Sequence, residues 1–123
     1  MSTSPGEVER LYAMTIHGLY EELGRSLTAT EYAKPAALTR EAAVERGQAL
    51  FSRFREKLIE KICRDWNYCG KRGEYGDFQT LAYALAPLVS SVAGVPATTA
   101  MVVTIILIKI GLDKLCNCPT GSS

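Results

Sequence analysis

The chain has 123 residues, of which 47 % are hydrophobic and 22 % are charged. These proportions are ordinary for a globular protein and exclude a wholly disordered or collagen-like chain. The net charge of +1 at pH 7 gives the molecule as a whole no basic surplus of the kind that nucleic-acid-binding proteins carry. We expect one helical domain over residues 1–123, ordered over about 4–117, with a frayed tail at 118–123.

The N-terminal sequence predicts one helix that begins at Ser4 and ends near Gly24. Ser4 and Glu7 form a capping box, and Pro5 takes the first helical position, where its missing N–H costs nothing. Apolar residues then recur every three or four positions and are expected to face the core. This predicted core face consists of Val8, Tyr12, Ile16, Leu19 and Leu23. Beyond Gly24, residues 25–38 lack a clear period and are expected to form a loop.

The longest predicted helix covers residues 40–66, with Thr39 as its N-cap. Its apolar residues alternate spacings of three and four along one seam. The seam consists of Val44, Gly47, Phe51, Phe54, Leu58 and Ile62. Basic residues follow a second line of the helix and are interpreted as an electrostatic rim for a protein partner. The rim consists of Arg46, Arg53, Lys57 and Arg64. Acidic residues interleave with the rim, so we do not expect a nucleic-acid partner.

Two further helices are predicted in the C-terminal half. Asp77 is a good N-cap for residues 78–93, and Gly94 and Pro96 separate this helix from the next, which covers residues 96–115. No segment combines strand periodicity with turn residues. The expected fold is therefore an all-α, small single-domain four-helix bundle with up-and-down connections and a very apolar C-terminal helix.

No charged residue occurs between residues 81 and 108. Because a helix that is apolar on every side must be buried on every side, three interpretations of the C-terminal helix remain open. It is internal to the bundle, or one face contacts another copy or a helical partner, or residues 78–115 insert into a membrane. The contact surface in the second interpretation consists of Val103, Ile106, Leu107, Ile110, Trp66 and Tyr68. Against the third, the Gly94–Pro96 break leaves each half shorter than the roughly 20 residues of a span.

The four cysteines are Cys63, Cys69, Cys116 and Cys118. Their low density and the absence of an export signal at the N-terminus favour free thiols in a reducing, cytoplasmic compartment. Two alternatives are kept. Both pairs would lie at the same end of an up-and-down bundle, where they could form a four-thiolate zinc site, although their spacing is not that of a typical zinc site. A disulfide between Cys69 and Cys118 is the other alternative.

No set of residues converges on a catalytic pattern. His17 is the only histidine, and the glycine-rich segment 70–77 matches neither of the common phosphate-binding spacings. We therefore expect no enzymatic activity and no cofactor. The predicted function is a non-enzymatic helical protein-interaction module, such as an adaptor, a signalling-assembly domain or a small accessory subunit. Its expected partner is a second copy or another helical protein. A membrane-active effector is the alternative, and an enzyme or metal-binding domain using the cysteines comes third.

Overall fold

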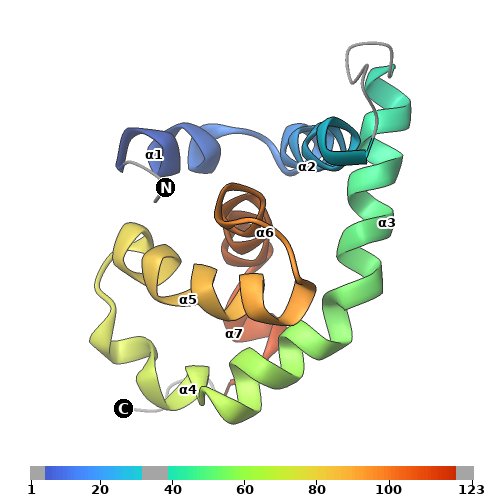
Figure 1. Ribbon diagram of the computed structural model, residues 1–123. Helices are drawn as coiled ribbons and strands as arrows, with labels where there is room; N and C mark the ends of the chain where they lie inside the picture. Colours follow the sequence, from blue (N-terminus) through green and yellow to red (C-terminus); the bar gives the residue numbers. More distant parts are fainter. Residues whose placement is uncertain (1–4, 32–38, 119–123) are drawn as a thin grey trace.

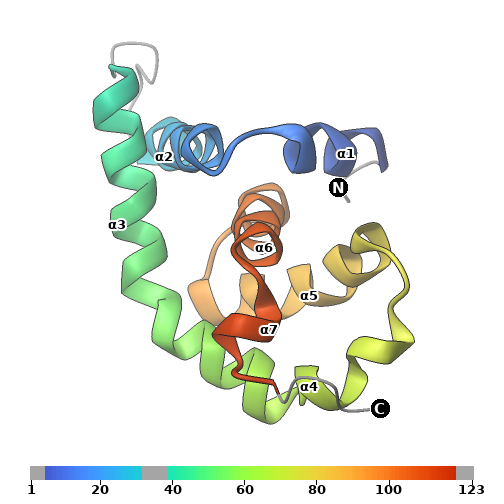
Figure 2. The same ribbon diagram turned by 180° about the vertical axis from the view of Figure 1, so that it is seen from behind.

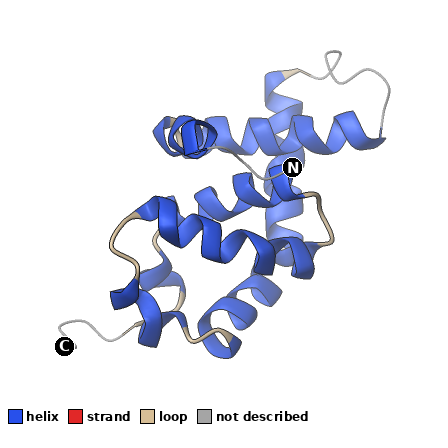
Figure 3. Cartoon of the chain, turned by 60° about the vertical axis from the view of Figure 1, so that its left-hand side comes forward, coloured by secondary structure: helices blue, strands red, loops and turns tan. Residues whose placement is uncertain are grey.

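The computed structural model describes residues 5–31 and 39–118, and these residues form helices with no strand among them (Figure 3). The all-α prediction is therefore confirmed. The elements in chain order are α1 (Pro5–Ala13), α2 (Ile16–Glu31), α3 (Arg40–Ile59), the π-helix η2 (Glu60–Asp65), α4 (Tyr68–Lys71), the 3-10 helix η3 (Arg72–Glu74), α5 (Phe78–Ala93), α6 (Ala97–Ile110) and α7 (Leu112–Leu115).

Helix α6 lies in the middle of the fold. Figures 1 and 2 show it nearly end-on, with α1 and α2 on one side, α3 along a second side and α5 on a third. Every residue from 99 to 107 is buried. Thr99 and Thr104 are the polar residues in this stretch, and the fully buried Thr104 is satisfied because its hydroxyl donates a 2.7 Å hydrogen bond to the carbonyl of Ala100. The interpretation of the apolar helix as internal is thus confirmed.

The up-and-down arrangement that we expected is not what the described helices adopt. The chain direction changes by 112° between α5 and α6, at the Gly94–Pro96 break. In an up-and-down bundle, the direction changes by about 160° between consecutive helices. The predicted caps are present: the Asp77 carboxylate accepts from the backbone N–H of Thr80, and Gly94 ends α5 with φ +67°. The local signals were therefore correct, while the angle between the helices was not encoded in them.

The single N-terminal helix that we expected is in fact two helices. A break at Thr15 divides them, and the Thr15 hydroxyl accepts a 2.9 Å hydrogen bond from the backbone N–H of Gly18, which caps α2. Helix α2 continues through Gly24 to Glu31, so the predicted stop at Gly24 is wrong, as is the start of the predicted loop. The rest of that predicted loop, 32–38, lies outside the described residues.

Gly24 has a packing role instead of a terminating one. A Cβ at Gly24 would lie 1.8 Å from the carbonyl oxygen of Ala43 in α3. Across the same crossing, a Cβ at Gly47 would lie 2.0 Å from the carbonyl oxygen of Tyr20 in α2. The two glycines therefore let α2 and α3 approach backbone to backbone. At each glycine, the opposite helix leaves no room for a side chain.

The break at Thr15 also changes which residues face the core. Val8 and Leu11 are buried, whereas the expected core residue Tyr12 is 37 % exposed. The Tyr12 ring stacks on Phe78 with centroids 3.9 Å apart, and Lys109 donates a 2.8 Å hydrogen bond to the Tyr12 carbonyl oxygen. Tyr12 therefore closes the edge between α1, α5 and α6 and does not fill the interior.

The long predicted helix is confirmed, with α3 and η2 together covering residues 40–65. Thr39 caps it by accepting from the backbone N–H of Ala42. At the other end of the chain, the predicted helix over residues 96–115 is interrupted at Gly111, where φ is +112° and α6 gives way to the short α7. A residue with a side chain is strained at that angle, so the glycine fixes the change of direction.

Candidate interaction groove and disulfide-linked end

The outer face of α5 carries a line of exposed, uncharged residues. Thr80, Tyr83, Pro87 and Ser91 follow one another at helical spacing and are all exposed. The opposite face is buried against α6; it consists of Ala82, Leu85 and Val89. The chain has no charged residue between residues 81 and 108, so the line contributes no charged side chain itself, and Asp77 caps the helix beside Thr80. Tyr83 is one of two large hydrophobic residues that are exposed among the described residues, so this line is a candidate contact site.

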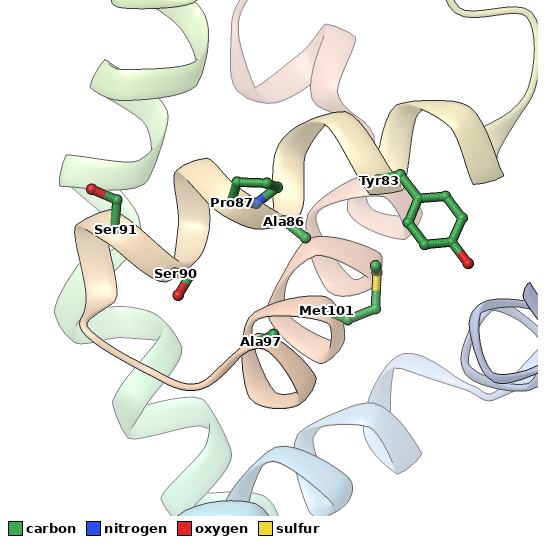
Figure 4. Close-up of a pocket in the computed structure, with 7 residues that line it drawn as sticks. All are labelled: Tyr83, Ala86, Pro87, Ser90, Ser91, Ala97 and Met101. Carbon is green, nitrogen blue, oxygen red and sulfur yellow. The ribbon is translucent and has the colours of Figure 1, made fainter. Parts of the chain in front are cut away.

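A groove of about 480 Å³ runs beside this line, between α5 and the first turns of α6 (Figure 4). Its lining consists of Tyr83, Ala86, Pro87, Ser90, Ser91, Ala97 and Met101. Met101, only 2 % exposed, forms the floor, and Ala86 points toward it from α5. The Ser90 hydroxyl donates a 2.7 Å hydrogen bond to the carbonyl of Val95, so it is already used within the chain.

The chemistry of the groove favours contact over catalysis. Tyr83 is the one lining residue that can titrate, and no lining residue is a carboxylate, an imidazole, a thiol or an amine. A nucleophile and a base within reach of each other are therefore lacking in the groove. The lining offers small apolar side chains and an aromatic ring, which suit an apolar segment of another molecule.

The predicted contact surface on the C-terminal helix is not on the surface of the chain. Val103, Ile106 and Leu107 are all buried by the chain's own helices, and Ile110 is half-buried. This corrects the expectation that they are exposed to a partner. Tyr68 is also buried, and Trp66 is half-buried beneath Tyr75, with ring centroids 5.5 Å apart. The uncharged exposed surface belongs to α5, which the sequence analysis did not single out.

The predicted electrostatic rim lies along α3 and η2 on the outside of the molecule (Figure 1). Arg53, Lys57 and Arg64 are exposed and Arg46 is half-buried. Arg64 forms a 2.8 Å ion pair with Glu60, one helical turn away. Such exposed pairs contribute little to stability, and none of the four rim residues lines the groove between α5 and α6.

The four cysteines form two disulfides, so the prediction of free thiols is wrong. Cys63 is bonded to Cys116 and Cys69 to Cys118, with Cα atoms 5.2 and 5.4 Å apart respectively. The second bond is the one that the sequence analysis kept as an alternative. The expectation that both pairs meet at one end of the molecule is confirmed. The zinc alternative is not supported, because the described residues contain no cluster of metal-binding side chains.

A small polar network lies beside the disulfides. The Tyr68 hydroxyl donates a 2.9 Å hydrogen bond to one oxygen of Asp113, and Arg72 forms a 3.0 Å ion pair with the other. Burial, followed by the hydrogen bond to Asp113, raises the pKa of Tyr68 to about 12. Lys71 lies 4.9 Å above the Trp66 ring. The two cations of the glycine-rich segment therefore have partners within the chain, which argues against a phosphate loop there.

His17 and the cysteines are the remaining candidates for a nucleophilic pair, and the structure does not bring them together as one. His17 is exposed in the first turn of α2, and the cysteines with which it could have formed a nucleophilic pair are in disulfides. Cys118, where the frayed tail was expected to begin, is buried, and residues 119–123 lie outside the described part.

The described residues thus form an all-α fold with a buried apolar helix, α6, and two disulfides. Comparisons with models of protein families, with curated proteins and with solved structures find no match. Among the described residues, no single helix is long and apolar enough to cross a membrane; α5 and α6 meet the length and composition criteria only as a pair bent by 112°.

Proposed function

We propose that this chain is a non-enzymatic interaction module that associates with a second copy of itself through α5. The observation that carries the proposal is the uncharged groove between α5 and α6, with the exposed line of α5 residues along its edge. An adaptor, a signalling-assembly domain or a small accessory subunit would use such a surface to assemble with other chains.

The pattern along α5 favours a second copy as the occupant. Pro87 lies midway between Tyr83 and Ser91, which are separated by about 12 Å of helix. If two copies of α5 run antiparallel across a two-fold axis at Pro87, the large Tyr83 of one copy faces the small Ser91 of the other. Each tyrosine ring would then enter its neighbour's groove beside Ser90 and Ala97. A two-fold contact requires this kind of self-complementary surface.

Charge supports the same choice of partner. The α5 face has no charge of either sign, so it offers nothing to attract an acidic or a basic peptide. It also contains no like charges that would oppose two identical faces. With a net charge of +1, two whole copies repel each other only weakly.

The two disulfides bear on where the module would work. Disulfides persist in oxidising compartments and are rare in the cytosol. They therefore favour an oxidising compartment over the cytoplasm that the sequence analysis expected.

The test is the mass of the full, oxidised chain by analytical ultracentrifugation over a concentration series. We expect a dimer for the wild-type chain and a folded monomer for Ser91→Glu, because two carboxylates would be buried near the groove. Ser52→Glu is the matched control, since Ser52 is equally a surface serine, but on α3. A wild-type chain that is monomeric throughout, or a Ser91→Glu variant that still dimerises, would overturn the proposal.

A membrane-active effector is the second candidate, favoured by the apolar α5–α6 pair. Flotation of the oxidised chain with vesicles of phosphatidylcholine and phosphatidylglycerol tests it. If the chain floats with the vesicles, the pair acts at a membrane. If it stays in solution as a dimer, the first proposal stands and this one falls.

A further inference from the structure

The C-terminal residues 111–118, which we term the strap, form a distinct unit at the disulfide-linked end. The strap begins at Gly111, where φ is +112° and the chain leaves α6. It then forms α7 and ends with Cys116 and Cys118. In Figure 2 the strap runs from the central helix down to the α4 end of the molecule.

The strap is joined to η2 and α4 by two bonds that redox chemistry can break, and Leu112 anchors it in the core. Disulfides join Cys116 to Cys63 and Cys118 to Cys69. Asp113 of the strap also contacts Tyr68 and Arg72. Backbone hydrogen bonds within the strap run from Gly111 to Cys118, and a helical segment this short does not persist by itself in water.

The central helix does not depend on the strap for its burial. Helix α6 packs mainly against α5 and α2, which lie outside the strap, and it has smaller contacts with α1 and with α7 of the strap. Its buried residues 99–107 end before Gly111. Opening at Gly111 would therefore uncover Leu112 and Tyr68, which are buried in the closed form, while leaving the packing around α6 in place.

The two disulfides differ in accessibility. Cys63 and Cys116 are both half-buried, whereas in the other bond only Cys69 is half-buried and Cys118 is 8 % exposed. Thiol–disulfide exchange requires a thiolate to reach a sulfur atom, so the bond between Cys63 and Cys116 should be attacked first.

We propose that the strap is a redox-operated latch: a dithiol reductant of the thioredoxin type, or dithiothreitol in its place, opens it at Gly111 while the helices around α6 stay folded. One reductant thiolate attacks a cysteine sulfur and forms a mixed disulfide, and its second thiol then closes the reductant's own disulfide. Each protein disulfide gains two electrons and two protons and becomes two thiols, and each reductant dithiol is oxidised to a disulfide. The latch does not require the α5 dimer.

Hydrogen exchange of the full chain, followed by mass spectrometry, tests the latch before and after reduction. In the oxidised chain, both the strap and α6 should be protected. After reduction, we expect amides of residues 112–118 to exchange within about tenfold of the unprotected rate, while residues 99–107 retain at least about a hundredfold protection. Alkylation during graded reduction should label Cys63 and Cys116 before Cys69 and Cys118.

Three results would overturn the latch. The strap could remain protected after reduction, the strap and α6 could lose protection together, or the bond between Cys69 and Cys118 could be reduced first. Two matched double variants, Cys63→Ser with Cys116→Ser and Cys69→Ser with Cys118→Ser, each retain one disulfide, and each should keep the strap closed until its remaining bond is reduced. If either variant fails to fold, reduction of the wild-type chain still decides the question.

Discussion

At the scale of single residues, Gly24 and Gly47 determine how α2 meets α3. Each lies against a backbone carbonyl oxygen of the opposite helix, at Ala43 and Tyr20, with no space for a Cβ. In an exposed helix, replacing glycine by alanine stabilises by about 1 kcal/mol. Here the clash should outweigh that gain, because neither carbonyl can move without shifting a helix.

We predict that Gly47→Ala lowers the free energy of unfolding by about 2 kcal/mol, since overpacking of about 3 kcal/mol exceeds the helix-propensity gain. Urea denaturation followed by circular dichroism measures the loss. Gly73→Ala is the control, because a Cβ there meets nothing within 4 Å. A Gly47→Ala variant as stable as the control would show that the two helices can separate without cost.

Tyr68 gives a pH-dependent prediction. Its pKa is raised to about 12 in the folded chain from the ordinary value of 10.0, so the folded state favours the neutral phenol. The stabilisation is therefore complete below pH 10 and is lost as the pH rises towards 12. We expect an alkaline loss on the order of 1–2 kcal/mol in the wild-type chain that Tyr68→Phe lacks. Denaturant titrations of both proteins at several alkaline pH values measure the difference, and parallel pH profiles would contradict it.

At the scale of elements, the signals that lie within a few residues of each other were reliable. Helices begin at Thr39 and Asp77 and one ends at Gly94, as expected, because a cap depends on hydrogen bonds to its immediate neighbours. Gly24 was misread because a glycine that ends a helix and one that makes room for another helix look the same in sequence. Threonine is a preferred N-cap residue, so Thr15 was a local signal for the start of α2. The apolar period continues across Thr15, however, and concealed the break between the two helices.

Helix α6 provides the element-scale prediction. Ile105 is completely buried in the described fold, and Ile105→Glu would bury a charge with no partner. We expect this variant to lose its cooperative thermal transition, with a cost of about 4 kcal/mol or more. Thr98→Glu, at an exposed position in the first turn of the same helix, should unfold like the wild-type chain. Calorimetry of both variants tests whether the helix is internal, and a folded monomeric Ile105→Glu would place Ile105 at a contact between chains.

At the scale of the whole molecule, the sequence could not place the candidate site. The uncharged run of residues 81–108 was visible in the sequence, but it covers parts of both α5 and α6. Of these two helices, α6 is buried and α5 keeps one face exposed. Which helix stays exposed depends on crossing angles that no local pattern records. Only the disulfide between Cys69 and Cys118 was among the alternatives, and free thiols were favoured because the cysteine density is low and the N-terminus lacks an export signal.

The two disulfides should act on stability in a non-additive way. They close loops of 53 and 49 residues, and the second lies close to the first at both ends. While one bond remains, the other closes an additional loop of only about 10 residues, so its loss should cost about 3 kcal/mol. Loss of the remaining bond frees the long loop and should cost about 4 kcal/mol more.

Guanidinium denaturation of the wild-type chain, the two double serine variants and the fully substituted chain measures these steps. Equal midpoints for the two double variants and a larger drop for the last bond are the expected pattern. The order of removal should not matter, because either bond alone closes a loop of about 50 residues in the unfolded chain. If removal of the first bond lowered the free energy of unfolding as much as removal of the second, each bond would act mainly through contacts in the folded state. The constraint on the unfolded chain would then not be the main effect.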